Sequence, residues 1–145
     1  MASAWYNKGK TQVMNGSIDL LTDTIKVMLV DNTYTFDADH AFVDDISGDE
    51  LSGTGYTGGF AGAGRKTLGS KAVNQDDTND RAEFDSTADV TWTSLDSGTV
   101  RAAILIKEIT NDAASIPIAY LDLGDEASTG GDFVIEWDSE GILQI

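Results

Sequence analysis

The sequence of 145 residues contains no cysteine, one proline (Pro117) and one histidine (His40). Without cysteine the chain forms neither disulfides nor thiolate metal sites, and a single histidine excludes a histidine-rich zinc site. Basic residues are also few: nine Lys and Arg stand against 25 Asp and Glu, so the formal net charge is −16. A surface this negative repels phosphate backbones and anionic headgroups, and we therefore expect no nucleic-acid partner and no membrane partner.

Long hydrophobic runs are missing as well. No stretch of roughly 18 apolar residues occurs, and no basic start leads into an apolar segment, so we expect neither a membrane span nor a secretory signal. The length corresponds to about one domain by the prior of roughly 150 residues per domain. We therefore predict a single β domain over residues 1–145.

Short apolar segments recur along the chain between turns rich in Gly, Asp, Asn and Ser, a pattern typical of β-strands. Amphipathic helical segments do not separate them, so we predict an all-β fold, an antiparallel β-sandwich or jelly roll of about eight strands. The alternating segment 99–109 is predicted to be the central strand, and Pro117 to lie near the start of its strand. The predicted strands are 24–30, 66–74, 81–85, 89–93, 99–109, 116–123, 132–137 and 142–145.

Two regions depart from this pattern. Residues 1–22 lack β alternation, and we predict a helix over about 4–14 that ends at the turn pair Asn15-Gly16, within a possible N-terminal arm. Residues 31–65 form a long acidic and then glycine-rich segment, which we expect to be a functional or disordered loop with one short helix within 38–48.

Candidate contact residues lie in these two regions. Trp5 and Tyr6 stand beside Lys8 and Lys10, which suits an arm that docks on a partner, although packing on the same domain is an equal alternative. If the segment is an arm, deletion of residues 1–10 should leave the domain folded and weaken binding. The glycine-rich loop is predicted to be mobile or to become ordered at an interface. Its candidate contact residues are Thr54, Tyr56, Phe60 and Arg65.

Motifs for catalysis or ligand binding are weak. The G-x-G-x-x-G match at 53–58 has no strand before it and no helix after it, so we interpret it as a loop rather than a nucleotide site. Asp76, Asp77 and Asp80 lack the spacing of a calcium loop and are better explained as a solvated turn. Since His40 is the sole histidine and no G-x-S-x-G motif occurs, we predict no enzyme, no metal site and no cofactor.

Five segments of the chain are distinctive: WYNKGK at 5–10, DTIKV at 23–27, SGTGYT at 52–57, DVTW at 89–92 and WDSEGI at 137–142. Together they resemble a family of small structural proteins of tailed bacteriophages, most closely the capsid decoration or cement proteins. That resemblance implies a β-sandwich or jelly roll that is made in the bacterial host cytoplasm and lies on the capsid exterior of the virion, where it binds the major capsid protein and its own copies. The alternative is a tail- or fibre-associated module that binds a host glycan or another tail protein.

Overall fold

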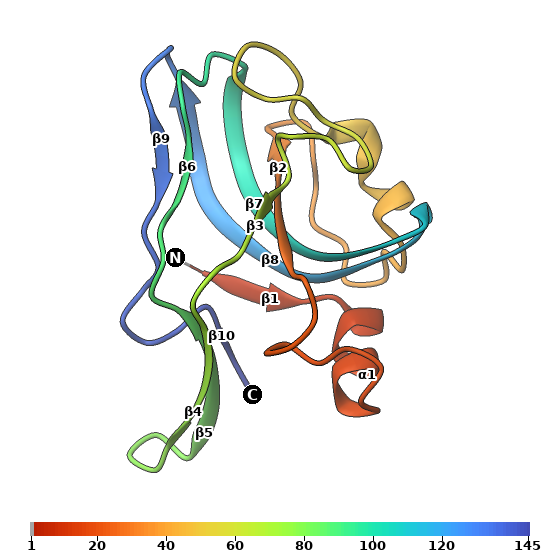
Figure 1. Cartoon of the computed structure of the whole chain (residues 1–145), viewed down its shortest axis with the longest axis vertical. Coiled ribbons are helices and arrows are strands. Elements are labelled where there is room, and N and C mark those ends of the chain that lie inside the picture. The colour runs from red at the N-terminus through yellow and green to blue at the C-terminus, as the bar shows by residue number, and fades with distance from the viewer. Residues whose placement is uncertain (1) are drawn as a thin grey trace.

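The computed structural model describes residues 2–145 and is mostly β (Figure 1). Its described part contains ten strands, one α-helix and two short 3-10 helices. All strand pairs are antiparallel, which confirms the predicted all-β, sandwich-like fold. The strands form sheets of five, three and two strands rather than two equal layers.

The five-stranded sheet has the order β1-β8-β7-β2-β3. Its two longest strands form a curved hairpin, and β7 lies in the middle of the sheet, as the alternating sequence predicted (Figure 1). Its strands are β1 (Ser3–Trp5), β2 (Lys26–Asp31), β3 (Lys66–Thr67), β7 (Gly98–Ile109) and β8 (Asn111–Ser128).

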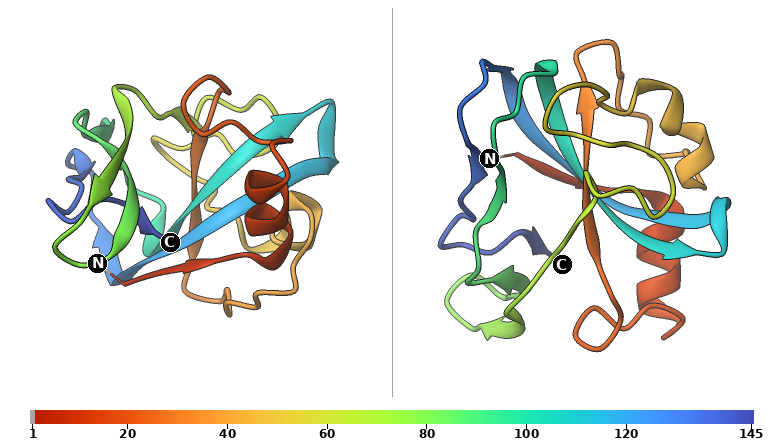
Figure 2. Two further views of the ribbon diagram at one scale, coloured as in Figure 1. Left: turned by 90° about the horizontal axis from the view of Figure 1, so that it is seen from below. Right: turned by 45° about the horizontal axis from the view of Figure 1, so that its top comes forward.

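The two smaller sheets lie on one side of the large sheet (Figure 2). One has the order β10-β5-β4 and the other pairs β6 with β9. The β4–β5 hairpin projects from the body of the molecule (Figure 1). The strands are β4 (Lys71–Asp76), β5 (Arg81–Ser86), β6 (Val90–Trp92), β9 (Phe133–Ile135) and β10 (Leu143–Gln144).

The large sheet is buried on both faces. Along β2, Val27 and Leu29 belong to the core cluster beneath the small sheets, whereas Met28 and Val30 belong to a second cluster. Side chains alternate between the two faces of a strand, so a strand that is covered on both sides reads as nearly continuously apolar. This explains why both faces of the segment 24–30 are hydrophobic.

The second face is covered by residues 31–50, which we expected to form a functional or disordered loop. Tyr34, Val43 and Ile46 from this segment are buried against the sheet together with Tyr6. The predicted short helix within 38–48 is replaced by two 3-10 helices, η1 (Val43–Asp45) and η2 (Ser47–Asp49). The acidic half of the predicted loop is therefore part of the fold, and its carboxylates lie between apolar anchors.

Two local predictions differ from the structure. The predicted strand 66–74 is divided, because β3 pairs with β2 whereas β4 pairs with β5, and Ser70 between them adopts a φ of +46°. Pro117 lies inside β8, next to an irregularity where the β7–β8 register shifts between Leu105 and Ile106. A proline is tolerated there because the regular ladder is already interrupted.

The N-terminal segment also differs from its prediction in part. Residues 3–5 form an edge strand rather than the start of a helix, and the helix α1 spans Asn7–Met14. Its predicted end is confirmed: Asn15 is the C-cap and Gly16 follows with a φ of +77°, which glycine adopts without strain.

Candidate functional site

The N-terminal aromatic residues are committed to contacts within the chain. The Tyr6 side chain is fully buried, and its hydroxyl shares a hydrogen bond of 2.8 Å with the hydroxyl of Tyr34. Burial raises the pKa of Tyr6 above that of a free phenol, so it remains protonated. Trp5 is partly buried and its Nε1 donates to the carbonyl oxygen of Gln144 at 3.1 Å. Tyr6 is therefore a core residue, not a surface contact.

The neighbouring lysines differ from each other. Lys8 places its Nζ 3.7 Å from the centre of the Phe42 ring, a cation–π contact, whereas Lys10 is exposed. The segment thus packs on its own domain, which is the second of the two alternatives raised by the sequence. Deletion of residues 1–10 would remove β1 and the buried Tyr6, so we no longer expect the truncated domain to keep its stability.

The glycine-rich loop packs against its own chain. Tyr56 is buried, and its hydroxyl donates to Glu50 Oε1 at 3.0 Å and accepts a hydrogen bond from the backbone N–H of Leu29 at 3.0 Å. Burial, aided by the charge of Glu50, raises the pKa of the Tyr56 phenol, which keeps it a donor. Thr54 and Phe60 are exposed and remain available for contacts.

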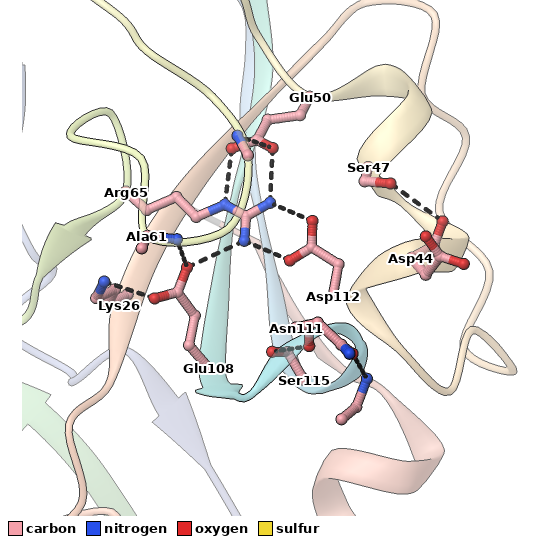
Figure 3. Close-up of polar contacts among 12 residues, drawn as sticks. Lys26, Asp44, Ser47, Glu50, Ala61, Arg65, Glu108, Asn111, Asp112 and Ser115 are labelled. Carbon is pink, nitrogen blue, oxygen red and sulfur yellow. Dashed lines mark hydrogen bonds and ion pairs between the residues drawn. The ribbon is translucent and has the colours of Figure 1, made fainter.

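Arg65, the last candidate of the loop, lies at the centre of a polar cluster (Figure 3). It is only 3% exposed and all five of its guanidinium N–H groups donate to carboxylates. Glu50 and Asp112 are each bound through two oxygens, at 2.7–2.8 Å and 2.6–3.1 Å, and Glu108 through one at 3.0 Å. Lys26 pairs with the other oxygen of Glu108 at 2.6 Å.

This Arg65 cluster joins segments that are distant in the sequence. Its carboxylates come from the end of η2, from β7 and from β8, and Arg65 itself directly precedes β3. All five N–H donors of Arg65 are used, so none is left to bind a ligand. We therefore interpret the cluster as structural: it holds the glycine-rich loop against the rest of the domain. Burial lowers the pKa of Arg65, but the hydrogen bonds to Glu50 and Asp112 outweigh it, so the pKa is raised and the charge is permanent.

Glu108 makes the cluster sensitive to acid. Burial raises its pKa, but hydrogen bonds from Lys26, from the Ala61 N–H and from Arg65 lower it by more, so its pKa lies below the ordinary value of 4.5. The unfolded chain therefore binds a proton more readily than the folded one. The stabilisation by Glu108 is complete above its unfolded pKa and is lost as the pH falls through the folded pKa.

We expect the free energy of unfolding to decline more steeply with acidification below about pH 4.5 in the native protein than in Glu108→Gln. The amide cannot take up the proton that drives this part of the transition. Urea titrations of both proteins between about pH 6 and pH 3 measure the two slopes. Equal slopes would show that Glu108 does not contribute.

A second feature, unlike the Arg65 cluster, is open to solvent. An apolar groove of about 410 Å³ runs between the N-terminal segment and the β10-β5-β4 sheet. Ile18, Phe84 and Leu143 form its buried floor, each at most 3% exposed. The large apolar side chains on its rim are Leu21, Val73 and Ile145, which are 49%, 50% and 57% exposed. Trp5, Val13, Leu20 and Ala82 also contribute to the apolar lining.

Strand register explains why the groove is apolar. Val73, Phe84 and Leu143 lie side by side on the neighbouring strands β4, β5 and β10. Two residues further along the sheet, Ala82 lies opposite Ile145. Residues two apart on a strand share a face, so these side chains form one continuous face of the small sheet. The main core covers the inner part of this face, and its outer part is exposed. The groove is therefore a continuation of the core that reaches the surface.

The polar surroundings of the groove are acidic. Asp19 and Glu83 contribute to its lining, and hydrogen bonds from Thr22 and from the N–H of Leu21 hold the pKa of Asp19 below its ordinary value. The basic side chains of the molecule are largely engaged. Within residues 2–145, ion pairs with carboxylates occupy Lys26, Arg65, Arg81, Arg101 and Lys107. Most of the 25 carboxylates consequently have no basic partner in the described part of the chain.

Of the sequence-predicted contact residues, only Trp5 lies at this groove. The sequence analysis did not identify Leu21, Val73 and Ile145. Val73 and Ile145 lie in predicted strands, and Leu21 lies between the predicted helix and the first predicted strand. One local signal was the apolar character of 142–145, where three of the four residues are Ile or Leu. A strand this apolar requires cover on both faces.

The remaining sequence motifs have local roles. Asp76 accepts hydrogen bonds from the N–H groups of Thr78 and Asn79 in the β4–β5 turn, as the turn interpretation predicted. In residues 2–145 no group of three or more His, Asp or Glu side chains is arranged to hold a metal ion. None of the helices in that range is long and apolar enough to cross a bilayer.

Comparisons with protein-family models, with curated proteins and with solved structures found no match for this chain.

Proposed function

We propose that this protein is a head decoration protein of a tailed bacteriophage, which stabilises the capsid through non-covalent contacts with the major capsid protein and with its own copies. The observation that carries the proposal is the apolar groove on a strongly acidic domain. Exposed apolar side chains that gather at one place mark interaction surfaces, whereas the same residues scattered singly do not.

The charge and the groove suit two stages of such a role. A net charge of −16 keeps free copies apart through mutual repulsion, so the protein stays soluble while its binding sites are being assembled. The groove then supplies a hydrophobic contact that gains free energy by burial. On a symmetric shell, many copies bind side by side, and contacts between neighbours add to the affinity of each one.

The test is the copy number of this protein in purified virions, measured by quantitative mass spectrometry against the major capsid protein. We expect a ratio near the number of capsid sites, that is, on the order of hundreds of copies per virion, because a decoration protein occupies a repeated lattice. A dozen copies or fewer would contradict a head location and favour the tail-associated alternative. Absence from the virion would refute a structural role.

A further inference from the structure

We propose that the apolar groove binds a short apolar segment of the major capsid protein that is flanked by Lys or Arg residues. This inference rests on the proposed function and assigns its contact site. It follows from three properties of the groove: its shape, the extent of its apolar rim and the charge around it.

The shape suits inserted side chains. The groove has a volume of about 410 Å³ and a floor of fully buried apolar residues, comparable with ligand sites of roughly 300–1,000 Å³. Its walls come from a sheet face on one side and from the segment 13–21 on the other. Apolar side chains that enter between these walls would contact Phe84 and Leu143 and complete the open end of the core.

The rim favours a protein segment over a small molecule. Leu21, Val73 and Ile145 are about half exposed, and Met14, which follows the groove residue Val13, is 73% exposed. A small ligand seated on the floor would leave these outer side chains in water. A polypeptide covers both the floor and the rim, as the buried anchors and surrounding contacts of protein interfaces do.

The charge selects the kind of segment. Asp19 and Glu83 line the groove, and the molecule carries −16 overall, so an anionic lipid, an acidic peptide or a second copy of this chain would be repelled. A Lys or Arg residue beside an apolar segment would meet the exposed carboxylate of Asp19 at the rim, whereas the carboxylate of Glu83 is already paired with Arg81 at 2.7 Å. Complementary charges of this kind accelerate association and suppress wrong partners.

The first test introduces a carboxylate into the groove with Val73→Asp, and uses Val134→Asp as the matched control. Val73 lies in β4 and Val134 in β9, both strands of the two smaller sheets, and they are similarly exposed, 50% and 46%. Only Val73 lines the groove. Binding to capsids prepared without this protein is measured by co-sedimentation. We expect Val73→Asp to weaken binding at least about tenfold, because an unpaired carboxylate in an apolar contact is costly, and Val134→Asp to leave it nearly unchanged.

The outcomes separate the inference from the proposed function. If the native protein binds capsids and Val73→Asp binds equally well, or both variants lose affinity to the same extent, the groove is not the contact site although the function stands. If the native protein does not bind capsids at all, both proposals fail.

A second experiment does not depend on a destabilising charge. Because the chain has no cysteine, Ile145→Cys provides a single attachment point for a photo-crosslinker at the rim, and Val134→Cys provides the control. We expect Ile145→Cys to crosslink to a capsid-protein peptide that is apolar and flanked by Lys or Arg. Crosslinks only to copies of this chain, to an acidic peptide or at the control position alone would overturn the inference.

Discussion

Replacement of Arg65 by alanine is expected to reduce the free energy of unfolding by about 3–5 kcal/mol, because it leaves buried carboxylates without their counter-charge. Glu50 loses both of its contacts to the guanidinium, and so does Asp112. The side chains of Glu50, Glu108 and Asp112 are only 5%, 10% and 17% exposed, so water can replace the lost donors only after the loop moves. Urea denaturation of the variant and the native protein measures the difference.

Two further variants distinguish the geometry of the cluster from its charge. Arg65→Lys retains the positive charge but has three donors in place of five, so its stability should fall between those of alanine and arginine. Arg101 is 31% exposed and pairs with Asp125, which is 45% exposed. Arg101→Ala should therefore lower the urea midpoint of unfolding much less than Arg65→Ala does. If Arg65→Ala and Arg101→Ala were equally stable, the cluster would not hold the loop in place.

The second large effect is expected from Gly9→Ala. Gly9 lies in α1 and is buried, and a Cβ atom there would lie 2.5 Å from the carbonyl oxygen of Pro117 and 2.6 Å from the Cα of Ile118. Both atoms belong to the backbone of β8, the partner of β1 and β7, so they cannot move without displacing the sheet. We expect a loss of about 2 kcal/mol or more in the free energy of unfolding, even though alanine favours a helix by about 1 kcal/mol over glycine.

Gly48→Ala is the matched control for this substitution. A Cβ atom at Gly48 meets nothing within 4 Å, and its φ is not in the left-handed region. The same chemical change should therefore alter stability by no more than about 0.5 kcal/mol. Urea denaturation of both variants gives the comparison, and a Gly9→Ala protein as stable as Gly48→Ala would show that α1 does not pack as closely as the structure indicates. Under the proposed function, displacement of α1 should also weaken capsid binding, since Val13 of the same helix lines the groove.

The sequence by itself determined those strands and helix ends that depend on a local pattern of residues. The alternation of apolar residues predicted β7 in the middle of the sheet, and the apolar residues of 24–30 predicted the strand β2. The pair Asn15-Gly16 predicted the end of α1 because a left-handed residue after a helix favours glycine. These features depend on residues within a few positions of each other, and they can therefore be predicted without knowledge of the fold.

Tertiary structure alone decided which residues are interior and which are free to bind. Tyr6, Tyr56 and Arg65 read as contact residues of an arm and a loop, yet long-range partners bury them: Tyr34, Leu29 and Asp112 respectively. Conversely, Val73 and Ile145 belong to predicted strands and were not among the candidate contact residues. They stand on the outer part of a sheet face that no element of the described chain covers. Burial depends on which segments become neighbours, and pairings between residues 27 to 47 positions apart leave no periodic trace in the sequence.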